Sequence, residues 1–202
     1  MTQSQKQLEG YEILLCVTGG IACYKVADLA SKLVQAGAGV SVAMTDSARH
    51  FVSELTFQSL SGRQVFTSMW QASESYESQH LSLTELADLM VVAPATANII
   101  AKMANGIADD LVSTLALSAA GECPILVAPA MNTRMWQAPP TQANVQRLQG
   151  WDVRFVGPAS GHLACGTVGP GRMSEVPDIL AAALDILQAR HPKRRRDRRG
   201  QE

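Results

Sequence analysis

Short apolar runs that predict β-strands alternate with stretches of helical periodicity along most of the chain. Strands are expected at 12–18, 39–45, 89–93, 125–128 and 152–156, with a shorter one at 65–66. Apolar residues at helical spacing occupy 21–36, 46–60, 98–119 and 141–148. This alternation predicts a parallel sheet with right-handed crossovers and helices on both faces. We therefore expect an α/β fold, a Rossmann-like (flavodoxin-like) three-layer sandwich built on about six parallel strands.

The length of 202 residues suits one such domain, and 47% hydrophobic with 17% charged residues is typical of a globular protein. We expect an N-terminal tail at 1–10, a single domain at 11–190 and a basic, disordered tail at 191–202. No apolar run approaches the roughly 18 residues of a membrane span, and the polar N-terminus lacks the apolar core of a signal peptide. The expected location is therefore the cytoplasm, with no membrane partner.

The basic residues gather at the C-terminus. Residues 193–202 hold six of the 17 basic and two of the 18 acidic residues, so residues 1–192 carry a net charge of −5. A basic tail of this kind can bind nucleic acid. A solvated end is the commoner role, and we expect no nucleic-acid partner.

The segment 93–111 follows a continuous apolar run, 89–92, and has the composition of a ligand-binding loop. Pro94 cannot donate to a central strand, so the strand is expected to end before it, and small neighbours let a backbone approach a ligand. Thr96 and Asn98 bring a hydroxyl and an amide to the carboxyl end of the strand, where open α/β sheets bind ligands. Asn98 could also cap the next helix. A tight turn with a good cap is the plainer alternative.

Thr18-Gly19-Gly20 lies between the first strand and its helix, where backbone N–H groups and the helix dipole can hold a phosphate. Hydroxyls of Thr45 and Ser47, at the end of the second strand, could reach the same phosphate. The Gly-x-Gly-x-x-Gly spacing of a dinucleotide site is absent. The sequence therefore favours a mononucleotide over a dinucleotide.

The segment 157–174 has no clear periodicity and contains five glycines, so we expect an irregular loop that can close over a site. Cys165 in this loop could be a mobile acid or an ordinary thiol. The other cysteines, Cys16, Cys23 and Cys123, show no metal-ligand spacing and are expected to be thiols. His80 follows the irregular stretch 67–79. Isolated histidines are more often structural, but an imidazole at such a boundary can act as a base.

Four strings resemble motifs of the homo-oligomeric flavin-containing cysteine decarboxylases. They are 19–22, 94–98, 163–166 and 129–136, the last with a complete Pro-x-Met-Asn-x-x-Met-Trp pattern; His80 is a further match. The resemblance covers about 13–187 and implies FMN at a subunit interface of a trimer, or of a dodecamer of trimers. The cofactor contacts that we then expect are Gly19, Gly20, Ile21, Thr45, Ser47, Phe51, Thr96, Ala97, Asn98, Ile99 and Ala130.

Within that family, the strings are most similar to those of enzymes that convert 4′-phosphopantothenoylcysteine to 4′-phosphopantetheine and CO2 in coenzyme A biosynthesis. In that chemistry FMN takes a hydride from the cysteinyl side chain, the thioaldehyde loses CO2 to give an enethiol, and the reduced flavin returns the hydride. The resemblance implies His80 as base, Asn132 as the group that orients the carboxylate, and Cys165 as acid. The implied substrate contacts are Asn132, Met135, His162, Ala164 and Met173.

Three alternatives stay open. Peptidyl-cysteine decarboxylases stop at the enethiol, and the Leu-Ala-Cys-Gly string at 163–166 argues against them because it supplies an acid for reduction. Flavin prenyltransferases share the fold but are not expected to carry the complete 129–136 string. A non-catalytic, flavin-loaded trimer that regulates a protein partner, or that binds nucleic acid through its basic tail, would not need His80.

The sequence departs from the family pattern at two positions. Gly20 stands where serine is usual, and Ile99 where threonine is usual. Both departures remove a polar contact to FMN. Because one domain is expected here, the resemblance also implies a separate ligase that makes the substrate.

Overall fold

The computed structural model describes residues 6–70, 79–162, 166 and 168–193, apart from the side chains of 79–81. Within them, six strands form one parallel sheet in the order β3-β2-β1-β4-β5-β6. The predicted α/β fold class is confirmed. The strands are β1 (Glu12–Val17), β2 (Gly39–Met44), β3 (Val65–Phe66), β4 (Leu89–Ala95), β5 (Ile125–Pro129) and β6 (Arg154–Phe155).

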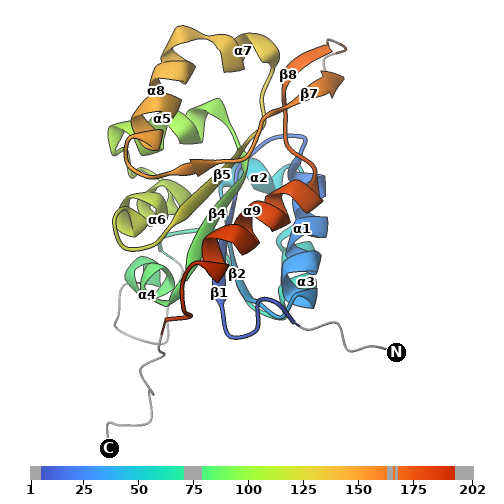
Figure 1. Ribbon diagram of the computed structural model, residues 1–202, viewed down its shortest axis with the longest axis vertical. Coiled ribbons are helices and arrows are strands. Elements are labelled where there is room, and N and C mark those ends of the chain that lie inside the picture. The colour runs from blue at the N-terminus through green and yellow to red at the C-terminus, as the bar shows by residue number, and fades with distance from the viewer. Residues whose placement is uncertain (1–5, 71–78, 163–165, 167, 194–202) are drawn as a thin grey trace, which may run out of the picture.

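Helices cover both faces of the sheet, as Figure 1 shows. In β1, Leu15 and Val17 contribute to one core, while Leu14 and Cys16 contribute to the other, because successive side chains point to opposite faces. The first core packs under α1 (Cys23–Gln35), α2 (Asp46–Arg49), α3 (Glu54–Ser61) and α9 (Val176–Gln188). The second packs under α4 (Gln79–Leu86), α5 (Ala97–Asn105), α6 (Leu111–Ala119) and α8 (Pro139–Gln149).

Some element boundaries differ from the expected ones. β4 does not end before Pro94 but continues to Ala95. The carbonyl oxygen of Ala95 accepts a hydrogen bond from Ala130 N at 2.9 Å, so this contact after β5 does not depend on an N–H group at Pro94. The helical stretch 46–60 is divided into α2 and α3, because the Ser53 hydroxyl caps a new helix by accepting from Leu55 N at 3.2 Å. Periodicity in the sequence predicts neither α7 (Thr133–Gln137) nor α9.

The segment 157–174 is not irregular throughout, which corrects the expectation. β7 (Ala159–His162) and β8 (Val168–Arg172) form a separate antiparallel sheet. Gly161 pairs with Gly169 in it, and strands with few apolar side chains show no alternation of apolar and polar residues in the sequence. Figure 1 shows this hairpin and α7 at one end of the molecule, beyond the carboxyl edge of the parallel sheet.

Residues near the expected domain limits are tied to the fold. Leu8 is fully buried in the core beneath α1. The Tyr11 hydroxyl donates to Arg190 O at 2.8 Å, and Lys193 N donates to Asp88 Oδ1 at 2.7 Å. The limits at 11 and 190 remain a prediction.

Candidate active site

The strand order reverses between β1 and β4, and ligands of open α/β sheets bind outside the carboxyl ends of strands at such a point. Thr18 joins these two ends. Its hydroxyl donates to Pro94 O at 2.6 Å and accepts from Thr96 N at 3.2 Å. Because Thr18 is only 2% exposed, both bonds are made inside the protein and hold the two turns side by side.

A cleft of about 570 Å³ opens beside this junction. Three segments form it: the loop and first turn of α1, the turn after β5, and the β7–β8 hairpin. It brings together six of the residues predicted from the sequence, namely Gly20, Ile21, Ala130, Asn132, His162 and Met173. Sequence analysis missed Tyr24, Lys25 and Arg172, which also line it. Lys25 lies one helical turn after the predicted phosphate loop, which is the signal that could have found it.

Asn132 is fixed in its orientation by the start of α7. Its side-chain oxygen caps the helix by accepting from Arg134 N at 2.8 Å. Met135 lies on the same helix and is half exposed. The preceding residue, Met131, donates its N–H to Gly171 O at 2.9 Å and so fastens the motif 129–136 to the hairpin.

We expect Gly171→Ala to destabilise this wall of the cleft. A Cβ at Gly171 would overlap the carbonyl oxygen of Met131, and φ is +140°, where L side chains are strained. The free energy of unfolding should fall by about 1–3 kcal/mol, measured by thermal unfolding. Gly20→Ala is the control, because its Cβ would meet no described atom within 4 Å. Equal stability of the two variants would contradict the proposed contact.

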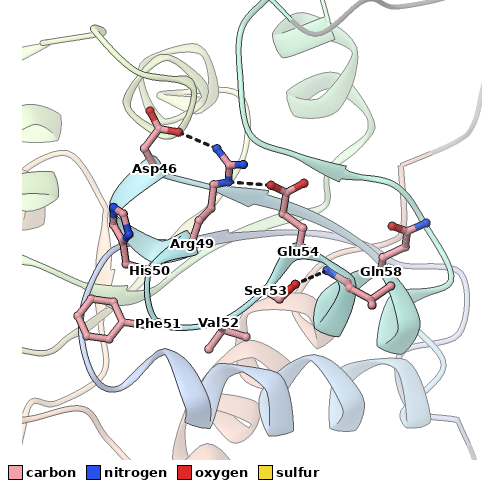
Figure 2. A pocket seen from close by; sticks show the side chains of 9 residues that line it. Asp46, Arg49, His50, Phe51, Val52, Ser53, Glu54 and Gln58 are labelled. Atoms are coloured by element: carbon pink, nitrogen blue, oxygen red, sulfur yellow. Dashed lines mark hydrogen bonds and ion pairs between the residues drawn. The ribbon is translucent and has the colours of Figure 1, made fainter.

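A second hollow of about 1000 Å³ lies at the carboxyl end of β2. Phe51 lines it, and Figure 2 shows Arg49 reaching both Asp46, at 3.3 Å, and Glu54, at 2.7 Å. A Cβ on Gly19 would overlap Ser47, so the glycine turn after β1 lies directly against the turn after β2. The predicted residues Thr45, Ser47 and Phe51 therefore lie on the same edge as the cleft, beside it.

The turn after β4 is built differently from the expectation. Thr96, not Asn98, caps α5, because its hydroxyl accepts from Ile99 N at 3.2 Å. Asn98 is exposed in the first turn of α5, next to the half-buried Ala97. Ile99 is 1% exposed and packs in the core, so its side chain is not available to a ligand at the carboxyl ends of the strands.

The structure does not bring His80 and Asn132 together within one chain. α4, which includes the backbone of His80, lies at the opposite end of the molecule from α7 and the hairpin in Figure 1. The side chain of His80 lies outside the described part of the chain. Ala164 and Cys165 also lie outside the described residues.

The cysteines that the structure describes, Cys16, Cys23 and Cys123, are free and buried. Burial raises the pKa of the Cys123 thiol to about 11 and raises that of Cys16 further still, so both stay protonated near neutral pH. Among the described residues, no three His, Cys, Asp or Glu side chains cluster as metal ligands would. Nor does that part of the chain contain a helix long and apolar enough to cross a membrane.

The strand order and the cleft at its reversal define a doubly wound α/β protein of the nucleotide-binding kind. The chain belongs to the Flavoprotein family, whose model matches residues 1–188. The coenzyme A biosynthesis bifunctional protein CoaBC of Bacillus subtilis (strain 168) is 48% identical over 176 residues, which are 87% of this chain and 43% of that protein. The chain thus spans less than half the length of this relative.

Two solved structures share the fold at recognisable identity. A PPC decarboxylase mutant complexed with pantothenoylaminoethenethiol gives a TM-score of 0.78 at 28% identity, covering 87% of this chain and 97% of that one. The FMN-dependent cysteine decarboxylase SpaF gives 0.73 at 30% identity, covering 87% and 95%. The resemblance to flavin-containing cysteine decarboxylases is confirmed by these matches.

Proposed function

We propose that the chain catalyses the FMN-dependent decarboxylation of 4′-phosphopantothenoylcysteine to 4′-phosphopantetheine and CO2. The observation that carries the proposal is the cleft, where Asn132 of the motif 129–136, the glycine turn after β1 and His162 of the hairpin line one cavity. The similarity to CoaBC, a coenzyme A biosynthesis protein, and to a PPC decarboxylase supports this substrate.

The residues at the edge of the sheet fit FMN as the cofactor. α1 begins without a side-chain cap in the described structure and has no acidic residue in its first turn, so the positive end of its dipole favours an anion. Gly19 keeps the turn after β1 against Ser47, which would place the Ser47 hydroxyl near the same anion. Phe51, half exposed in the adjoining hollow, offers an aromatic surface. When bound, FMN would supply the two-electron acceptor that a cysteinyl decarboxylation needs.

The chain's own residues would then bind, orient and move protons. The capped amide of Asn132 would hold the substrate carboxylate in a fixed orientation, which lowers the entropic cost of the reaction. His80 would take the proton of the substrate thiol, and Cys165 would donate the proton that completes the product. The hairpin, with His162 over the cleft, would exclude water.

The site would be completed by another copy of the chain in a homo-oligomer, a trimer or a dodecamer of trimers. The position of α4 far from the cleft supports this, because His80 and Asn132 of one chain could not then act on one substrate. Exposed apolar side chains in the wall of the cleft support it as well: Ile21 is 61% exposed and Tyr24 64%. The cytoplasmic location stays a prediction.

Decarboxylation of a cysteine without the reductive step is the second candidate. The similarity to SpaF, an FMN-dependent cysteine decarboxylase, favours it. The chain is 48% identical to CoaBC but only 30% identical to SpaF, so we prefer decarboxylation followed by reduction to 4′-phosphopantetheine. Product mass separates the two, because an enethiol is two hydrogens lighter than 4′-phosphopantetheine.

We expect the purified protein to be yellow with non-covalent FMN, and its flavin absorbance to bleach transiently when 4′-phosphopantothenoylcysteine is added without oxygen. The two hollows beside an uncapped helix start are the reason for the first expectation. Free cysteine is the control and should leave the absorbance unchanged. A colourless protein that also fails to take up added FMN would overturn the proposed enzyme.

A further inference from the structure

Two cations missed by the sequence analysis, Lys25 and Arg172, line the same cleft and share one carboxylate. Lys25 Nζ lies 3.1 and 3.0 Å from the two oxygens of Glu175, and Arg172 Nη2 lies 2.8 Å from Glu175 Oε1. The hydrogen bond and charge of Lys25, helped by Arg172, hold the pKa of Glu175 below its usual range. Two cations therefore face one ionised carboxylate, and the cluster carries a net charge of +1.

The carboxylate leaves part of this donor set unused. Arg172 Nε is buried and has no hydrogen-bond partner among the described residues. A guanidinium has five N–H groups and an ammonium three, so one carboxylate cannot occupy them all. A Cβ on Gly161 would lie 3.4 Å from Arg172 Nε and Cζ, which shows that the guanidinium lies against the glycine of β7.

The start of α1 also makes the electrostatic potential at this site more positive. Lys25 lies in the first turn of α1, a helix of 13 residues whose start has no side-chain cap in the described structure and no acidic residue. The positive end of the helix dipole therefore adds to the two cations. A small, doubly charged anion is the ligand that matches a fork of guanidinium donors, an ammonium and a helix start.

We infer that Lys25 and Arg172 form the subsite for the phosphate monoester of the substrate, on the part of the cleft wall where both cations meet Glu175. The inference rests on the proposed function, since it takes phosphopantothenoylcysteine as the substrate. Asn132 lines the same cleft. The cleft therefore offers the Asn132 amide to a carboxylate, and Lys25 with Arg172 to a phosphate. The Glu175 carboxylate holds the charged ends of Lys25 and Arg172 close to each other before substrate binds.

FMN also carries a phosphate monoester, and the experiment separates the two sources. The ratio of kcat/KM for 4′-phosphopantothenoylcysteine to that for pantothenoylcysteine measures recognition of the substrate phosphate. The Kd of FMN measures recognition of the cofactor phosphate. Both are determined for the parent and for Lys25→Gln and Arg172→Gln.

Each variant should lower the substrate ratio by about ten- to a hundredfold, with FMN affinity within about twofold of the parent. Lys25→Arg, which keeps the charge, should restore most of the ratio and guards against a folding defect. Lys32→Gln is the matched control. Lys32 lies on the same helix but does not line the cleft, and its Nζ lies 3.6 Å from Asp28 Oδ1.

An unchanged ratio in both folded variants would overturn the inference and leave Lys25, Glu175 and Arg172 as a brace between α1 and the start of α9. A loss of FMN affinity with an unchanged ratio would assign the cations to the cofactor and also overturn it. A parent protein that decarboxylates neither substrate would instead count against the proposed function itself.

Discussion

Replacing His80 with asparagine is expected to slow the bleaching of the flavin by substrate by a factor of about 10²–10⁴. Asparagine has a similar size and can hydrogen-bond, but it cannot accept a proton from the substrate thiol. The fold and the yellow colour should persist, because His80 lies in the first turn of α4, whose later residue Thr84 holds α4 to α6 through a 2.9 Å hydrogen bond to Ser118. Rapid-mixing absorbance without oxygen measures the rate.

His191→Asn is the control, since His191 is exposed in the segment after α9 and lies away from the cleft. It should bleach at the parent's rate. Near-normal bleaching by His80→Asn would instead favour the non-catalytic regulator, which has no use for a base.

Mixed oligomers sharpen the same test. If each site takes His80 from one copy and Asn132 from another, unfolding and refolding His80→Asn together with Asn132→Asp should recover activity that neither variant has alone. Some mixed oligomers would then contain one intact site. No recovery, in samples that native mass spectrometry shows to contain mixed oligomers, would contradict a site shared between copies.

Replacing Cys165 with serine is expected to stop product formation after CO2 has left. A serine hydroxyl has nearly the shape of a thiol but is a far weaker acid, since the ordinary pKa of a cysteine is about 8.5. The variant should bind FMN, bleach it with substrate and release CO2, while the enethiol accumulates in place of 4′-phosphopantetheine. Mass spectrometry should find a species two hydrogens lighter than the parent's product.

Cys123→Ser is the matched control, because Cys123 is a buried thiol just before β5, at the end of that strand away from the cleft. This variant should make the same product as the parent, although its free energy of unfolding should be lower. If Cys165→Ser makes 4′-phosphopantetheine at the parent's rate, the proton comes from another group.

The sheet itself was predictable from the sequence. β1, β4 and β5 are buried on both faces and so read as continuous apolar runs, which periodicity identifies. The hairpin was not, because Gly161 and Gly169 face each other in it without side chains to alternate. Nor was the cap of α5, since Thr96 and Asn98 are both good capping residues and only the backbone geometry chooses between them.

By itself, the sequence determined the order of the six strands of the parallel sheet along the chain and, through the motif 129–136, the resemblance to flavin-containing cysteine decarboxylases, because both are properties of neighbouring residues. The tertiary structure alone decided which distant residues share a cavity. Thr18 meets Pro94 across a gap of 76 positions, and Lys25 meets Glu175 across 150. Parallel strands are joined by crossovers, so the residues at one edge of the sheet come from separate parts of the chain, and no local pattern records which of them will touch.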